Sequence, residues 1–258
     1  MTDLGLGNIV LLVGAAALAG AVNAVAGGGS LISFPALLLA GYPAVTANIT
    51  NTVALCPGYV GGTIGYRREL VGQEGRAIAL GLTSTVGAVA GSYLLLISSP
   101  AVFDRIVPYL VLAACALLAV QSPLARMVRK GTGTGEFEVG WARVLLHVVQ
   151  FGAAVYGAYF GAGVGIMMLA VLGILLSDTM RRLNTLKGLM ALVINVVGAA
   201  YFSIFADVEW FAVAIMAAAA LLGGRIGVAV ALRINDQVLR WLVVVFGVAV
   251  AIWLMVAD

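Results

Sequence analysis

Charged residues are scarce in this chain. Only 10% of its 258 residues are Asp, Glu, Lys or Arg, whereas 63% are hydrophobic, and the mean hydropathy is +1.12. Soluble domains carry about 25% charged and about 45–50% apolar residues. This shortage of charge excludes a soluble fold, and we expect an all-α polytopic membrane protein embedded in a lipid bilayer.

Histidine and cysteine are equally rare. The chain has one histidine, His147, and two cysteines, Cys56 and Cys115, which lie in apolar runs without the spacing of a disulfide or metal site. An enzyme would need catalytic carboxylates, a Cys/His pair or metal ligands. We therefore expect no enzyme, no cofactor and no metal site. The net charge of +3 without a basic face rich in aromatics also argues against a nucleic-acid partner.

Long hydrophobic runs are what the chain has in abundance. Most are close to the ~20 residues that a helix needs to cross the hydrocarbon core. The second and seventh runs are too short to span straight, and each follows a glycine cluster, so we expect half-helices or re-entrant segments there. The ten apolar runs, which give eight to ten membrane segments, fall at 8–27, 31–41, 46–65, 77–97, 106–121, 144–163, 166–177, 186–205, 210–231 and 239–257.

The loop charges predict the orientation. Placing four basic loops in the cytoplasm leaves only Arg105 among the basic residues outside, which satisfies the positive-inside rule. Both termini then lie on the non-cytoplasmic side of the inner membrane. No basic residue precedes the first run, so we interpret it as a retained span and not as a signal peptide.

The chain also repeats itself. At a shift of 136 residues, which sets Asn48 against Asn184, residues 26–29 align with 162–165 without a gap. Each half holds five segments, an odd number, so the second half enters the membrane upside down. Inverted repeats are typical of secondary transporters. We expect a first transmembrane repeat at 1–125, a cytoplasmic linker at 126–143 and a second repeat at 144–258.

Polar groups inside the apolar runs indicate which ligand fits. No acidic residue lies in the middle of a run, which argues against a cation site. Consecutive glycines allow several backbone N–H groups to point at one anion, and a helix that begins at Ser30 or Ser33 adds its positive end. Pro35 would then fall in the first turn, where it is tolerated. The alternative is that glycines, such as Gly87 and Gly91, only allow close helix packing.

These observations predict the site residues. Asn48 and Asn51 share a helix face and correspond, at the 136-residue shift, to Asn184 and Lys187. Lys187 and Arg225 could instead reach the membrane interface with their charged ends. The candidate substrate-binding residues are Gly27, Gly28, Gly29, Ser30, Asn48, Thr50, Asn51, Gly163, Gly165, Asn184 and Lys187, with Asn23, Ser33, Asn195 and Arg225 as a secondary set.

Two segments carry a family resemblance. "AGAVNAVAGGGSLISFPALLLAGYPAVTANITNTVALCPG" at 19–58, with "YGAYFGAGVGIMMLA" at 156–170 and "LNTLKGLMALVIN" at 183–195, resembles the TauE/SafE family of sulfite exporters and anion permeases. The resemblance implies an inner-membrane protein that moves sulfite, sulfonates or related sulfur anions. It also implies a site at Gly27–Ser30, Asn48, Thr50, Asn51, Asn184 and Lys187. Val164 interrupts the second glycine block.

We therefore expect a secondary transporter that exports a small sulfur oxyanion or organosulfonate by alternating access. The alternatives are an anion channel, an importer of another small anion, and a membrane subunit without transport activity. The sequence does not distinguish among oligomeric states.

Overall fold

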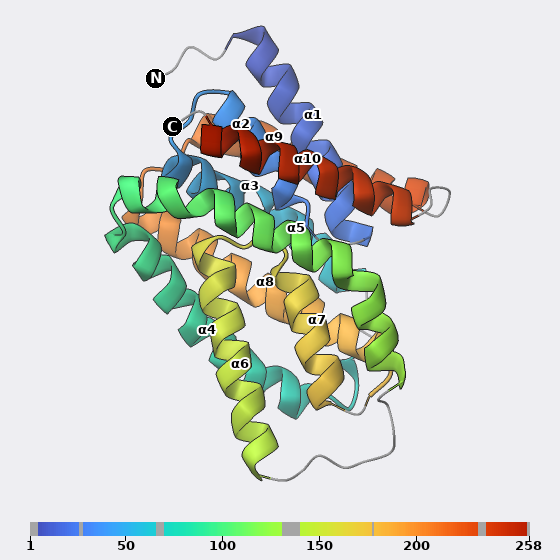
Figure 1. The fold of residues 1–258 in the computed structure, drawn as a ribbon. Helices are drawn as coiled ribbons and strands as arrows, with labels where there is room; N and C mark the ends of the chain where they lie inside the picture. The colour runs from blue at the N-terminus through green and yellow to red at the C-terminus, as the bar shows by residue number, and fades with distance from the viewer. Residues whose placement is uncertain are drawn as a thin grey trace.

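The computed structural model describes residues 5–25, 28–65, 70–130, 140–176, 178–231 and 236–256. These residues form ten helices and no strand, which confirms the all-α fold (Figure 1). The helices are α1 (Leu6–Val25), α2 (Ser30–Leu39), α3 (Ala44–Gly65), α4 (Glu74–Ile97), α5 (Pro100–Lys130), α6 (Gly140–Tyr159), α7 (Val164–Leu175), α8 (Met180–Phe205), α9 (Trp210–Ala231) and α10 (Asp236–Val256).

Helix packing follows the expected repeat. When each helix is exchanged for the one five places along the chain, most packing partners are preserved. The contact of α1 with α9 becomes that of α6 with α4, and the contact of α3 with α9 becomes that of α8 with α4. The contacts of α2 with α1 and α3 become those of α7 with α6 and α8. Among the described residues, the correspondence is weakest for α5, whose contacts with α3 and α7 are more extensive than those of α10 with α8 and α2.

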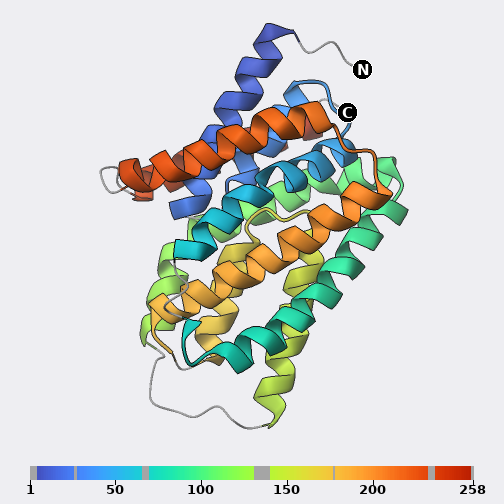
Figure 2. The same cartoon turned by 180° about the vertical axis from the view of Figure 1, so that it is seen from behind.

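Each half of the chain also contributes one helix to the bundle that is formed mainly by the other half. Helix α9 packs with α1 and α3, and α4 packs with α6 and α8. Two bundles result, a first bundle of α1, α2, α3 and α9, and a second bundle of α4, α6, α7 and α8. They occupy the upper and lower parts of Figure 1, with α5 crossing between them. From behind, α9, α3, α8 and α4 form one row, joined across the bundles by the contact of α3 with α8 (Figure 2).

Glycines set the closest crossings within each bundle. A Cβ atom built on Gly91 of α4 would collide with the carbonyl oxygen of Val155 on α6. At the corresponding crossing of α1 and α9, a Cβ on Gly20 would collide with the Ala220 carbonyl oxygen. This close approach confirms the packing interpretation of Gly87 and Gly91, because a Cβ on Gly87 would also lie 2.8 Å from the Phe151 carbonyl oxygen.

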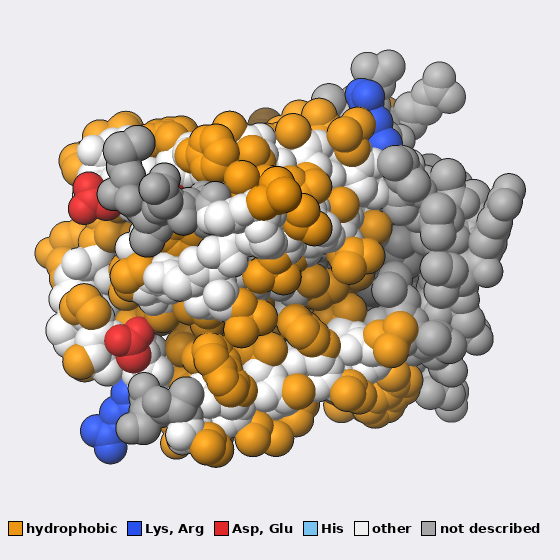
Figure 3. All heavy atoms as spheres, turned by 90° about the horizontal axis from the view of Figure 1, so that it is seen from above, with side chains coloured by type: hydrophobic (Ala, Val, Ile, Leu, Met, Phe, Trp, Pro, Cys, Tyr) orange, Lys and Arg blue, Asp and Glu red, His pale blue; other side chains and the backbone are white. Residues whose placement is uncertain are grey.

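The outer surface is apolar. Large hydrophobic side chains such as Leu82, Val86, Ile204 and Val245 are more than 60% exposed. Seen from above, orange hydrophobic atoms cover much of the described surface, and the charged side chains lie toward its left and right edges (Figure 3). Within the described part of the chain, four helices are long and apolar enough to cross a membrane by length and composition. Such a surface is stable against lipid and would be unfavourable in water.

Helices α2 and α7 each begin next to a glycine cluster. We call the cluster at 28–29 the first glycine break and the cluster at 161–165 the second glycine break. With 10 and 12 residues, these helices extend only about 15 and about 18 Å, short of the ~30 Å hydrocarbon core. A Cβ on Gly28 would lie 3.6 Å from Leu118, and one on Gly163 would lie 3.3 Å from Ala114. Those two α5 residues are one helical turn apart, near the middle of α5. The two breaks therefore lie close together.

The structure differs from the sequence prediction at two places. Helix α5 continues to Lys130 and α6 begins at Gly140, so both helices extend beyond the apolar runs at 106–121 and 144–163. A helix continues past the point where hydrophobicity ends, which a count of apolar residues does not register. Pro35 is also not in the first turn of α2, because that helix begins at Ser30. It lies in the interior, where Leu31 loses an N–H partner for its carbonyl.

Candidate functional site

The first glycine break is closed by a side chain of its own bundle. The Oδ1 atom of Asn23, near the end of α1, accepts hydrogen bonds from the N–H groups of Gly28 (3.2 Å) and Gly29 (2.7 Å). Gly28 has φ +112°, in the region that favours glycine. These two N–H groups, predicted to face an anion, already have an acceptor. Gly27 lies outside the described residues.

The serines of this break are buried within α2. Ser30 is 9% exposed and Ser33 is fully buried. The hydroxyl of Ser33 donates to the carbonyl oxygen of Gly29 at 3.3 Å, and the backbone N–H of Ser33 bonds the same oxygen at 3.2 Å. The Ser33 side chain therefore bonds the first turn of its own helix.

The second glycine break has no such closure. Gly163, with φ +75°, is the N-cap of α7, and no side chain caps this helix end. The N–H groups of Gly163 and Gly165 have no acceptor among the described residues, although those of Val164 and Ile166 bond the preceding turn. Tyr159 stands where the first repeat has Asn23, so the capping amide is missing. Unpaired N–H groups at a helix start are suited to an anion.

Lys187 lies against this second break. A Cβ built on Gly165 would be 3.7, 3.8 and 3.9 Å from the Cδ, Cε and Nζ atoms of the Lys187 side chain. The side chain is half-buried, and no described carboxylate pairs with it. An ammonium group and free N–H groups thus lie at one helix start. An anion bound there would gain charge-assisted hydrogen bonds from donors without competing acceptors.

Asn48 of α3 connects the first bundle to this break. Asn48, 1% exposed, donates from Nδ2 to the carbonyl oxygen of Tyr159 at 2.8 Å, immediately before the second break. Phe34 of α2 packs edge-on against Phe160 in the same turn, with ring centroids 5.4 Å apart. Asn51, 2% exposed, has an Oδ1 atom without a partner among the described residues. The equivalents of Asn48 and Asn51 in α8 are Asn184, which is half-buried, and Lys187.

The remaining candidates lie in other surroundings. The hydroxyl oxygen of Thr50 accepts from the N–H of Glu209 at 3.3 Å, just before α9. Asn195 donates to the Ala191 carbonyl oxygen at 2.9 Å and is hydrogen bonded to Tyr59. Arg225 is exposed, in keeping with a charged end that reaches the membrane interface. Among the described residues, none of these three side chains is hydrogen bonded to a residue of either glycine break.

Sequence reasoning missed two groups of polar residues. The Tyr156 hydroxyl donates to the Ala162 carbonyl oxygen at 2.7 Å and so holds the second break. Gln150 donates to Ser84 at 2.8 Å inside the second bundle, where both side chains are at most 1% exposed. The 136-residue shift pairs Tyr156 with Gly20 and Gln150 with Gly14. Differences between the repeats, and not only their matches, would have indicated these residues.

Comparisons with known proteins agree with the membrane architecture. The family model described as sulfite exporter TauE/SafE matches residues 12–254. A probable membrane transporter protein, ORF9, from Sinorhizobium sp is 26% identical over 99% of this chain and 95% of its own. The probable membrane transporter protein YfcA of Escherichia coli (strain K12) is 26% identical over 89% of this chain and 83% of its own. A relative from Haemophilus influenzae with the same description is 24% identical over 94% and 92%. No solved structure gives a significant match.

Proposed function

The chain belongs to the sulfite exporter TauE/SafE family, and we propose that it exports a small sulfur oxyanion or organosulfonate across the inner membrane by alternating access. Its relatives are named as probable membrane transporters, and its fold is that of a multi-pass membrane protein. The substrate, the direction and the site are our proposal.

One observation carries this proposal. The ammonium-bearing side chain of Lys187 lies against Gly165, at a helix start whose N–H groups lack acceptors among the described residues. Inside a bilayer such donors are costly unless protein or a ligand satisfies them. A small oxyanion carries several strong acceptors and a negative charge, so it satisfies the N–H groups and the ammonium group together.

The arrangement of the bundles suits alternating access. Each bundle contains one short helix that begins at a glycine break, and the two breaks lie within about one turn of each other along α5. We infer that the bundles rock about the contact of α3 with α8, and so expose the site to each side in turn. An inside-negative potential favours anion exit by about 2.3 kcal/mol per charge per 100 mV, so export needs little further coupling.

The test is transport by purified protein in proteoliposomes. We expect saturable flux of labelled sulfite that falls when competing sulfur anions are added. Sulfite, sulfate, thiosulfate, taurine and sulfoacetate should also be compared for their ability to raise the melting temperature, which identifies the ligand that binds the folded state. No flux and no stabilisation by any of these anions would overturn the proposal. Single-channel currents would identify a channel instead.

A further inference from the structure

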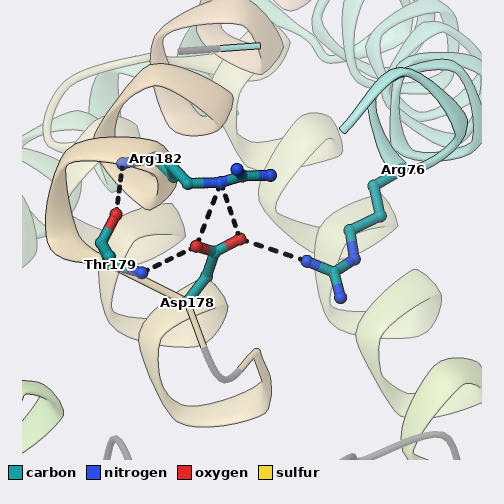
Figure 4. Close-up of polar contacts among 4 residues, drawn as sticks. All are labelled: Arg76, Asp178, Thr179 and Arg182. Carbon is teal, nitrogen blue, oxygen red and sulfur yellow. Dashed lines mark hydrogen bonds and ion pairs between the residues drawn. The ribbon is translucent and has the colours of Figure 1, made fainter. Parts of the chain in front are cut away.

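A cluster of two arginines and one aspartate lies where the first turns of α4 and α8 meet (Figure 4). The Asp178 carboxylate accepts from Arg76 Nη1 at 3.3 Å, through Oδ2. Arg182 Nε lies 3.2 Å from Oδ2 and 3.1 Å from Oδ1. The N–H of Thr179 donates to Oδ1 at 2.8 Å, and the Thr179 hydroxyl oxygen caps α8 by accepting from the Arg182 N–H at 3.4 Å.

The two arginines occupy unfavourable helix positions. Arg76 is the third residue of α4 and Arg182 the third residue of α8, so both cations lie at the positive ends of helix dipoles. Two helix starts and two guanidinium groups together attract negative charge strongly. The Asp178 carboxylate, whose side chain is only 13% exposed, accepts from both arginines, and the carboxylate of Glu74 attracts Arg182 from the first turn of α4. The arginine side chains are 48% and 33% exposed, so their guanidinium groups keep accessible donors.

The cluster lies on the same helix as the candidate site. Arg182 and Lys187 are five residues apart on α8, which is about 7.5 Å along the axis and about 140° around it, so only their long side chains can face the same anion path. The first bundle has nothing similar, because the 136-residue shift places Tyr42, Thr46 and Ala212 at the positions of Asp178, Arg182 and Arg76. Among the described residues, such a cluster is found only in the bundle that contains Lys187.

We propose that Arg76 and Arg182 form a second binding site for the transported anion at this end of the pathway, and that Asp178 is a tethered anion that occupies it between transport events. This inference rests on the proposed function. An anion moving to or from Lys187 displaces the carboxylate and takes over its guanidinium donors, which are suited to oxyanions. The carboxylate keeps the arginines paired when no substrate is present, and competes with substrate for them.

Two substitutions that should shift the KM in opposite directions test this proposal. We expect Asp178→Asn to lower the KM for labelled sulfite about two- to fivefold when the anion is added on the side of the protein where Arg76 and Arg182 lie. The reason is that the competing charge is gone, while the amide oxygen still accepts from Thr179. Arg76→Gln, which leaves the pair of Asp178 with Arg182 intact, should raise the same KM. The KM from the opposite face should change little in both variants. Melting temperatures establish that each variant is folded.

Glu74→Gln is the matched control. It removes one negative charge at the same end of α4, where Glu74 accepts from the Gly72 N–H at 3.0 Å and attracts Arg182 without forming an ion pair with either arginine among the described residues, so its effect on the KM should be the smaller one. If Asp178→Asn changes the KM no more than Glu74→Gln, or if Asp178→Asn and Arg76→Gln shift it in the same direction, Asp178 is a structural latch and the inference is wrong. Absence of flux in the wild-type protein would instead overturn the proposed function.

Discussion

The two glycine breaks have related sequences but different chemistry. In the first, Asn23 accepts from the N–H groups of Gly28 and Gly29, and the position equivalent to the lysine holds neutral Asn51. In the second, Tyr159 replaces the capping asparagine, the N–H groups of Gly163 and Gly165 lack described acceptors, and Lys187 supplies a charge. We infer that a duplication provided two helix starts of the same kind. We infer that the N–H groups of one start became hydrogen bonded within the protein, while those of the other stayed available for a ligand.

The largest effect is expected from making the second break resemble the first. Lys187→Asn replaces the charge with the residue type found at the equivalent position 51. Loss of a hydrogen bond to a charged group costs about 1.5–3 kcal/mol, so we expect kcat/KM for sulfite flux to fall about 10- to 100-fold. Lys187→Arg, which retains the charge, should keep more activity. Flux above half of the wild-type value in Lys187→Asn would remove Lys187 from the site.

Glycine substitutions separate the breaks by available space. A Cβ on Gly29 would collide with the Ala19 carbonyl oxygen and lie 2.9 Å from Asn23 Cγ, whereas one on Gly165 meets only the Lys187 side chain at ordinary contact distance. We expect Gly29→Ala to reduce the free energy of unfolding by about 1–3 kcal/mol, because backbone cannot yield as a side chain can. Gly165→Ala should change it by less than about 0.5 kcal/mol. Equal melting temperatures for the two variants would contradict this difference.

Sequence patterns predicted local features better than they predicted which helices and side chains contact one another. Ten apolar runs became ten helices because hydropathy determines which segments enter lipid, and Gly28 and Gly163 mark the breaks because their positive φ values favour glycine. The exchange of α4 and α9 between bundles was not predictable, since periodicity does not say which helices meet. The same holds for Asn23, whose acceptor role depends on the path of the chain between α1 and α2.

The smallest effect is expected from replacing Asn23, which tests whether its side-chain oxygen occupies a position that an anion could take. Asn23→Ala leaves the N–H groups of Gly28 and Gly29 without their acceptor, which costs about 1–2 kcal/mol of unfolding free energy. The opened break should then resemble the second one. We therefore expect sulfite or sulfate to raise the melting temperature of Asn23→Ala more than that of the wild-type protein.

Tyr159→Phe is the control in the second break, because among the described residues the Tyr159 hydroxyl makes only a long 3.4 Å hydrogen bond to Ser98. This variant should show the wild-type response to anions. If anions stabilise Asn23→Ala no more than they stabilise Tyr159→Phe, then the freed N–H groups of the first break do not form an anion site. The contrast between the breaks would then rest on the charge of Lys187 and not on the presence or absence of a capping amide.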